Sequence, residues 1–336
     1  MSARSRPTFA VAHPNIALAK YWGKRAGAGN YPAVPSLSVT LAGLETRTRL
    51  ELRDDVPADR LVLNGEVAKG KGMERAAALF DRVRAAAGIT SRMVVESTND
   101  FPTASGLASS ASGFAALAVA AVRAAGLDWG ADRISDLARR GSASAARSLF
   151  GGFVELEGVA DEAPLGPEGL LAARPVASPE QLPLRILVCV ATESAKTVGS
   201  TEGMRATASS SPYHAGWLAE GPRIFHAMKK ALAERDFAAV GELAERSALA
   251  MHANALAGGV VYWSGVTLEA LSAVRALRAR GTPAFATMDA GPHVKVIVKP
   301  EDAALVGTWM RAVPGVLRVI ECEPGEGARV VEEGAP

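Results

Sequence analysis

The sequence is poor in cysteine and has no excess of charge of one sign. Its 336 residues include two cysteines, Cys189 and Cys322, and neither has the paired spacing of a zinc site or a disulfide scaffold. Basic residues number 37 and acidic residues 35, which leaves a formal charge of +2. We therefore expect two buried, reduced thiols, and no bulk electrostatic attraction for nucleic acid.

The chain also lacks a segment suited to targeting or to spanning a membrane. Only a very short apolar run precedes Pro14, which is too little for a signal peptide. The stretch from Phe101 to Val122 is uncharged and matches the length of about 20 apolar residues that crosses a bilayer. Its serines, glycines and alanines would gain little from lipid, however. We predict a cytoplasmic protein with no membrane role.

Metal-ligand spacing and the two commonest nucleotide-binding patterns are absent as well. The histidines fall at none of the spacings of a zinc site, so we predict no metal held tightly by the protein itself. Neither GxxxxGK[ST] nor GxGxxG occurs in the chain. A nucleotide would therefore need a different kind of loop.

The segment "FPTASGLASSASG" is a candidate for such a loop, because it links the strand-like "MVVES" to an alanine-rich segment. Backbone N–H groups at a helix N-terminus attract anions. Gly106 permits unusual backbone geometry, and the hydroxyls of Ser109 and Ser110 can bind phosphate oxygens or complete a Mg²⁺ shell. From this stretch alone, a phosphate loop and a closely packed small-residue helix are equally supported.

Length and periodicity predict an α+β protein of about two lobes. Alternation or apolar runs predict strands near 45–53, 60–67, 93–97, 153–156, 184–192, 284–289 and 294–299, with Asn64-Gly65 as a hairpin turn. Apolar stripes predict helices near 76–87, 131–141, 222–255 and 268–277. The stretch from Gly158 to Pro183 lacks periodicity and is the best candidate for a lobe boundary.

Several separate stretches resemble the mevalonate diphosphate decarboxylase family of the GHMP kinase superfamily. They span nearly the whole chain in the family's order: "NIALAKYWGKR", "FPTASGLASSASGFAAL", "GSASAARSLFGGFVEL", "KTVGSTEGM", "MHA" and "MDAGPH". The resemblance implies a two-lobed GHMP kinase fold. Residues 1–183 would form an N-terminal lobe like domain 2 of ribosomal protein S5, with the phosphate loop. Residues 184–336 would form a ferredoxin-like C-terminal lobe with the catalytic aspartate.

The resemblance also implies the reaction and its participants. Members use ATP and Mg²⁺ to phosphorylate the 3-hydroxyl of mevalonate 5-diphosphate, after which phosphate and carbon dioxide leave and isopentenyl diphosphate remains. This is a step of the mevalonate pathway of isoprenoid biosynthesis. Members are commonly homodimers, so a homodimer is expected here.

Matching motif positions imply catalytic roles for Asp289, Lys20, Arg147 and Ser144. Asp289 would act as base or orienting acceptor for the 3-hydroxyl, and Lys20 would lie near the transferred phosphoryl group. On spacing alone, a turn aspartate bonded to its own backbone is the more common interpretation, and the "MDAGP" context reverses that preference. Arg147 would bind the substrate carboxylate, which a planar guanidinium can grip with two hydrogen bonds; a surface arginine is otherwise the ordinary interpretation.

The remaining implied contacts divide between substrate and ATP. Substrate would be bound by Tyr21, Lys24, Ser142, Ser144, Arg147, Thr201 and Met204. ATP would be bound by Ser105, Gly106, Leu107, Ala108, Ser109, Ser110 and Lys196, with its Mg²⁺ near Ser109. Three positions depart from the family pattern: Ala143 and Ala146 stand where glycine and cysteine are usual, and His293 stands where asparagine is frequent.

Two groups of alternatives stay open. The same aspartate and phosphate loop would serve a decarboxylase of mevalonate 5-phosphate or a kinase that phosphorylates the 3-hydroxyl without decarboxylation. A non-catalytic ligand sensor on the same fold is a further alternative, which the intact set of functional side chains disfavours.

Overall fold

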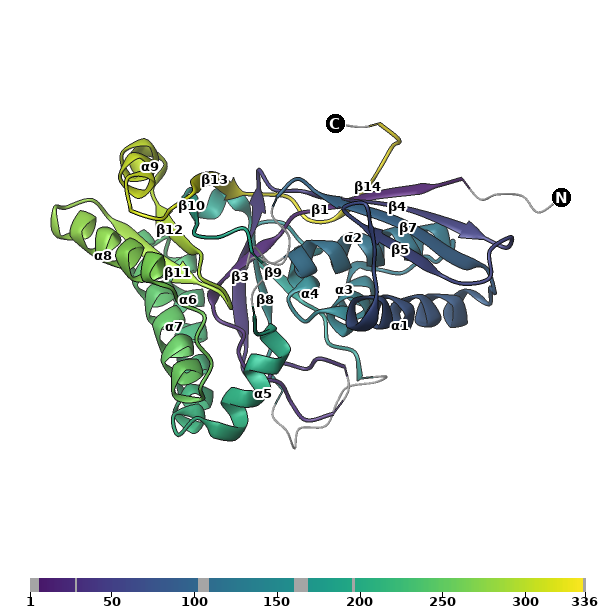
Figure 1. Cartoon of the computed structure of the whole chain (residues 1–336), viewed down its shortest axis with the longest axis horizontal. Coiled ribbons are helices and arrows are strands. Elements are labelled where there is room, and N and C mark those ends of the chain that lie inside the picture. The colour runs from purple at the N-terminus through teal and green to yellow at the C-terminus, as the bar shows by residue number, and fades with distance from the viewer. Residues whose placement is uncertain (1–5, 28, 102–108, 160–168, 195–196, 335–336) are drawn as a thin grey trace.

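The computed structural model describes residues 6–27, 29–101, 109–159, 169–194 and 197–334, which form two β-sheets with helices packed against them (Figure 1). The α+β prediction is thereby confirmed. The predicted ATP contacts Ser105, Gly106, Leu107, Ala108 and Lys196 lie outside the described residues.

The first sheet contains six strands within the described residues, in the order β14-β1-β4-β7-β5-β6. Their bounds are β14 Arg329–Val331, β1 Thr8–Ala12, β4 Thr46–Arg53, β7 Arg92–Asn99, β5 Arg60–Leu63 and β6 Glu66–Val67. In β4, buried and half-buried residues alternate, as the period of two predicts. The hairpin between β5 and β6 is also confirmed: Asn64 and Gly65 both have positive φ, 48° and 84°.

Four helices accompany this sheet in the described part of the chain: α1 Gly70–Ala87, α2 Ser109–Ala124, α3 Ala131–Gly141 and α4 Ala145–Ser148. The predicted end of α1 is confirmed at Gly88, whose φ of 66° and N–H bond to the Arg84 carbonyl close the helix. Helix α2 is buried along most of its length and packs on β1 and β4. From Ser109 onward, the uncharged segment is therefore a core helix, and none of the described helices is long and apolar enough to span a membrane.

The second sheet has the order β11-β12-β10-β13-β3-β8-β9, with β2 paired to β3, which makes eight strands among the described residues. Their bounds are β11 Ala284–Met288, β12 Val294–Val298, β10 Arg185–Val190, β13 Arg318–Pro324, β3 Ser36–Ala42, β8 Phe153–Leu156, β9 Arg174–Ala177 and β2 Asn15–Ala19. Both cysteines are buried and unpaired, as expected, in β10 and β13. Strand β9 lies within the stretch 158–183, where no periodicity had indicated one.

The helices of this half are α5 Ser200–Ser210, α6 His214–Ala233, α7 Phe237–Ala257, α8 Gly265–Ala279 and α9 Ala303–Arg311, with short 3₁₀ turns η2 Pro179–Gln181 and η3 Pro300–Asp302. Helix α6 begins at His214, so the predicted start near Pro222 is wrong. Pro222 lies inside the helix, and tertiary packing of Trp217, Ile224 and Phe225 outweighs the hydrogen bond that proline cannot make.

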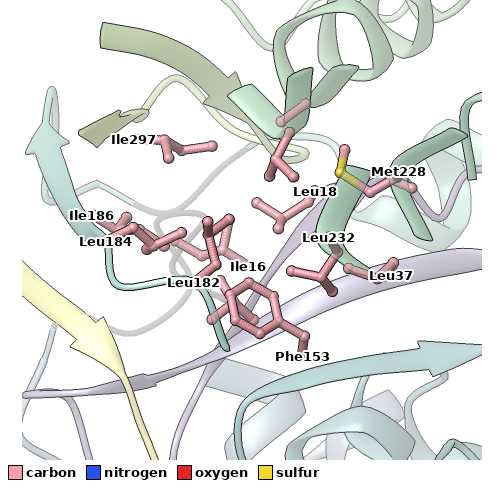
Figure 2. Packing of buried hydrophobic residues seen from close by; sticks show 14 of the residues in the cluster. Ile16, Leu18, Leu37, Phe153, Leu182, Leu184, Ile186, Met228, Leu232 and Ile297 are labelled. Carbon is pink, nitrogen blue, oxygen red and sulfur yellow. The ribbon is translucent and has the colours of Figure 1, made fainter. Parts of the chain in front are cut away.

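The largest apolar cluster joins the two halves (Figure 2). It brings together Ile16, Leu18 and Leu37 of β2 and β3, Phe153 of β8, and side chains of β10, β12 and α6. Strand β3 pairs with β13, and the C-terminal strand β14 pairs with β1. Each sheet thus contains strands from both sides of residues 183/184. The lobe boundary placed there stays a prediction.

Candidate active site

Asp289 lies directly after β11 and is held between two lysines. Lys20, at the end of β2, donates from Nζ to Oδ1 at 2.8 Å, and Lys295 of β12 lies 3.0 Å from Oδ2. Burial on its own would raise the pKa of Asp289, but both lysines hold it well below its usual range. The carboxylate is therefore ionised at neutral pH. Burial lowers the pKa of Lys20 to about 8, against the opposing effect of Asp289.

Arg147 of α4 is a buried guanidinium whose protein partners are all neutral. Its side chain donates to Ser38 Oγ at 2.9 Å and Ser36 Oγ at 2.7 Å, and lies 3.4 Å from Asn15 Oδ1. Only 2% of the residue is exposed, and burial lowers its pKa to about 10. Because no described acidic side chain forms an ion pair with it, the site offers a charged fork to an anionic ligand.

Asn15, the first residue of β2, fixes the position of this arginine. Its Nδ2 donates to the Ser144 carbonyl at 2.9 Å and to Ser148 Oγ at 2.8 Å, which leaves Oδ1 to face the guanidinium. Nearby, the Tyr21 hydroxyl is buried without a hydrogen-bond partner among the described residues. Burial raises the pKa of Tyr21, so this phenol is neutral and can donate to a ligand.

Three serine hydroxyls form a row between the start of α2 and the turn before α4. Ser110 Oγ lies 3.4 Å from Ser142 Oγ, which lies 3.3 Å from Ser144 Oγ. Helix α2 has no acidic residue in its first turn, where Ser109 is the first helical residue. The structure therefore brings together the described part of the predicted phosphate loop and the predicted substrate serines.

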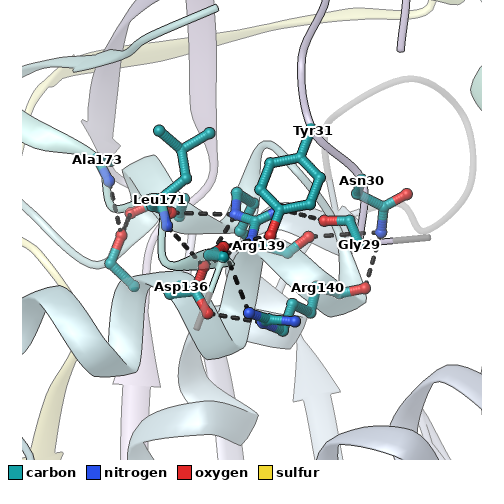
Figure 3. A network of polar contacts seen from close by, with 11 residues as sticks. Gly29, Asn30, Tyr31, Asp136, Arg139, Arg140, Leu171 and Ala173 are labelled. Carbon is teal, nitrogen blue, oxygen red and sulfur yellow. Dashed lines mark hydrogen bonds and ion pairs between the residues drawn. The ribbon is translucent and has the colours of Figure 1, made fainter. Parts of the chain in front are cut away.

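Lys24 lies beside a polar network that shapes the loop following it in the chain. Its Nζ donates to Asn30 Oδ1 at 2.7 Å and to Thr201 Oγ1 at 2.9 Å. Asn30 has positive φ, 56°, and donates to the Arg140 carbonyl at 2.7 Å; Figure 3 shows this loop against α3. Burial, together with the charges of Arg75 and Arg205, lowers the pKa of Lys24 to about 8. These cations form a positive region.

Of the two predicted contacts in α5, only Thr201 lies beside a charged site residue. Met204 is buried among Trp22, Trp217 and Tyr262, where it packs the apolar wall behind the loop of Lys24. A close approach explains why glycine precedes it: a Cβ on Gly203 would lie 2.2 Å from the Tyr262 hydroxyl. Whether Met204 touches a ligand stays a prediction.

Two histidines support the turn that carries Asp289. His252 of α7 lies with Nε2 3.1 Å from the Asp289 carbonyl, and the Ala191 N–H donates to His293 Nδ1 at 3.1 Å. Burial lowers the pKa of each to about 3, so both are neutral at physiological pH. His293 joins the turn to the end of β10, as a structural histidine would.

Sequence reasoning missed Lys295, Asn15, and the serines of β3. Lys295 had a usable signal: it is a single charged residue in "VKVIV", a strand apolar enough to be buried on both faces. Asn15 stands in a quoted motif, but nothing in the local pattern shows that its amide faces Arg147. Ser36 and Ser38 lie more than 100 positions from that arginine, so only the pairing of β3 with β8 brings them near it.

Comparison with known proteins shows the family to which the chain belongs. A family described as diphosphomevalonate decarboxylase-like N-terminal domain matches residues 12–163, and one described as mevalonate 5-diphosphate decarboxylase C-terminal domain matches residues 186–322. The Haloferax volcanii phosphomevalonate decarboxylase is 37% identical, with 85% of this chain and 86% of that protein covered. The Candida albicans diphosphomevalonate decarboxylase is 35% identical, with 95% and 96% covered.

Solved structures show the same fold. The mevalonate diphosphate decarboxylase from Enterococcus faecalis superposes with a TM-score of 0.87 at 35% identity, over 97% of this chain and 99% of that one. A structure of MDDEF in complex with MVAPP, AMPPCP and magnesium has a TM-score of 0.88 at 35% identity and the same coverage. The fold is that of the GHMP kinase superfamily, as predicted. Within that superfamily, the chain belongs to the mevalonate diphosphate decarboxylase family.

Proposed function

We propose that the protein catalyses the ATP-dependent decarboxylation of mevalonate 5-diphosphate to isopentenyl diphosphate, ADP, phosphate and carbon dioxide. The observation that carries the proposal is an ionised Asp289, held by Lys20 and Lys295, whose charge reaches Arg147, a buried cation that has no acidic partner among the described residues. One group can accept the proton or hydrogen bond of a hydroxyl. The other matches a carboxylate on the same small substrate.

The chemistry assigns each group a step. Asp289 accepts the hydrogen bond and then the proton of the 3-hydroxyl, whose oxygen attacks the terminal phosphorus of ATP as the bond to ADP breaks. Lys20 has three ammonium protons; Ala17 O, at 2.7 Å, and Asp289 Oδ1 take two, which leaves one for the transferred phosphoryl group. The C–O bond to the new phosphate then breaks, carbon dioxide leaves, and the electron pair of the broken C–C bond forms the double bond.

ATP and Mg²⁺ fit the described part of the site. Ser109 and Ser110 begin α2, whose first turn carries no negative charge, and Ser110 faces the hydroxyls of Ser142 and Ser144. Serine oxygens suit Mg²⁺, which would neutralise the phosphate oxygens of ATP. The solved complex with AMPPCP and magnesium supports this assignment. Contacts from the residues 105–108 and from Lys196 remain part of the proposal.

The positive region of Lys24, Arg75 and Arg205 favours a diphosphate over a monophosphate, because a second phosphate adds charge to be neutralised. Decarboxylation of mevalonate 5-phosphate is the second candidate, and the 37% identity to a phosphomevalonate decarboxylase favours it. We also propose a cytoplasmic homodimer, which the family resemblance implies. Sedimentation equilibrium of the purified protein tests the dimer.

The first experiment supplies purified protein and Mg-ATP with mevalonate, its 5-phosphate or its 5-diphosphate, and measures ADP and carbon dioxide together. Equal release of both with the diphosphate alone is expected. Preference for the monophosphate would reassign the substrate, and ADP without carbon dioxide would indicate a 3-hydroxyl kinase. Asp289→Asn should fold normally and lose most turnover, whereas the exposed Asp128→Asn should match the wild type.

A further inference from the structure

Lys295 is a buried cation that forms an ion pair with the catalytic carboxylate. It is 0% exposed at the second position of β12, between Val294 and Val296, and its Nζ lies 3.0 Å from Asp289 Oδ2. We propose that Lys295 is a positioning residue for the reaction: it keeps the Asp289 carboxylate ionised and fixed in one orientation while Lys20 serves the phosphoryl group. This inference rests on the proposed function of the site.

The hairpin of β11 and β12 builds this contact. Lys295 is paired directly with Thr287 in the antiparallel ladder. Asp289 lies two positions beyond Thr287, so it projects on the same face, diagonally across from Lys295. A long lysine side chain spans such a diagonal. The contact is therefore set by strand register together with the short turn that follows β11.

The two lysines occupy different oxygens of Asp289 and have different surroundings. Lys20 is bound to Oδ1 and to the Ala17 carbonyl, and directly follows β2. Lys295 holds Oδ2 from within the β-sheet. When phosphate oxygens draw the Lys20 ammonium toward ATP, the Oδ1 contact weakens. The Oδ2 contact then still prevents rotation of the carboxylate and preserves its charge.

Other ionisable groups around Asp289 cannot replace this role. His252 touches only the Asp289 main-chain carbonyl, His293 belongs to the turn and bonds to Ala191, and burial keeps both neutral. The charge of Arg147 also reaches Asp289, but its donors are directed at Ser36 and Ser38. Among the described residues, Lys295 is thus the cation that can hold Asp289 throughout the phosphoryl transfer.

The first test compares Lys295→Met, which keeps length and removes charge, with Lys295→Arg and with the exposed control Lys230→Met. For Lys295→Met we expect kcat to fall about tenfold to a hundredfold with little change in KM, because the carboxylate loses its orientation after substrate has bound. The acid limb of the pH–kcat profile should move to higher pH, because Asp289 loses one of two cations that favour its charged form. Lys295→Arg should restore the profile in part.

A double variant separates positioning from a general structural effect. If Lys295 acts through Asp289, Lys295→Met should cause no further loss of turnover in the Asp289→Asn background. Additive losses, or a single variant with wild-type kcat and pH profile, would overturn the proposal. If Lys295→Met does not fold, the same measurements can be made on Lys295→Gln, which keeps a hydrogen-bond donor but removes the charge.

A second measurement does not depend on turnover. Carbon-13 NMR of the aspartate carboxyls, with Asp289→Asn to identify the signal, should show Asp289 ionised to the lowest pH at which the wild type is folded. In Lys295→Met the same signal should titrate at higher pH. An unchanged titration would refute the proposed role of Lys295, whatever the substrate proves to be. A shifted titration in a protein without decarboxylase activity would support the role of Lys295 and refute only the proposed function.

Discussion

The buried guanidinium of Arg147 sets the clearest expectation at the scale of single residues. Arg147→Met should raise KM for the substrate at least about thirtyfold, which corresponds to the roughly 2 kcal/mol lost when one member of a buried charge pair is removed. Mevalonate 5-diphosphate should raise the melting temperature of the wild type and not that of the variant. Steady-state kinetics and thermal unfolding with and without substrate measure both effects.

The control for that prediction is Arg223→Met, because Arg223 is exposed on α6. It should bind substrate as the wild type does. A substrate-induced rise in melting temperature that survives in Arg147→Met would assign the substrate carboxylate to another group.

The lowered pKa of Lys24 predicts how substrate binding depends on pH. Burial and the charges of Arg75 and Arg205 lower this pKa to about 8, so Lys24 is charged below pH 8 and loses its charge as pH rises through that value. An anionic diphosphate then binds less well. KM should rise above about pH 8, and the measurement is KM for mevalonate 5-diphosphate between pH 6.5 and about 9.5.

Lys24→Arg supplies the matched variant, because a guanidinium stays charged throughout that range. Its KM should stay flat, while the titration of Lys20, whose pKa is also lowered to about 8, should still change kcat. The same rise of KM in Lys24→Arg would show that another group is responsible.

At the scale of elements, helix α7 supports the site by its close approach to β11. A Cβ at Gly241 would lie 2.1 Å from the Phe285 ring, so only glycine allows this approach. The same helix carries Ser247, whose Oγ accepts from the Lys20 N–H at 2.9 Å, and His252 against Asp289. A shift of α7 therefore reaches both catalytic groups.

Gly241→Ala should lower the free energy of unfolding by about 1 to 3 kcal/mol, because the methyl overpacks the helix–sheet contact. In α6, nothing lies within 4 Å of a Cβ added at Gly216. Gly216→Ala should therefore raise the free energy of unfolding by about 0.5 to 1 kcal/mol, because alanine loses less backbone entropy than glycine when the helix forms. Urea denaturation of the two variants measures the contrast. Equal stability of the two would show that α7 can move away from β11 at no cost.

At the scale of the whole molecule, the two halves are bound by strands rather than by a linker. Strand β3 pairs with both β8 and β13. The last strand, β14, pairs with the first strand, β1, at the other end of the molecule (Figure 1). The apolar cluster of Figure 2 spans the same region. Opening one half would therefore expose buried surface of the other.

We accordingly expect a single cooperative unfolding transition. Trp129, packed beside α2 and α3, and Trp309 of α9 report from opposite ends of the molecule. Fluorescence of the Trp129→Phe and Trp309→Phe variants in urea should give midpoints that coincide with that of circular dichroism. Separate midpoints would show that the two halves unfold independently.

The sequence by itself determined much of the local structure and the family. Periodicity of two in β4, left-handed turns at Asn64-Gly65 and Gly88, and the strand ending at Asp289 are short-range consequences of side-chain alternation and of backbone sterics. The motif resemblance, confirmed by the comparisons, also singled out Asp289, Lys20 and Arg147, and the structure brings the first two together.

Only the tertiary structure decided which groups surround those residues. The two lysines that contact Asp289 come from the end of β2 and from β12, whereas Asp289 itself follows β11. The side chains that contact Arg147 of α4 come from β2 and β3. Apart from the contact within the β11–β12 hairpin, these contacts join positions more than 100 residues apart. The secondary-structure propensity of a short segment carries no information about such contacts. The start of α6 before Pro222 has the same origin, because packing energy gathered from distant elements exceeded a local preference.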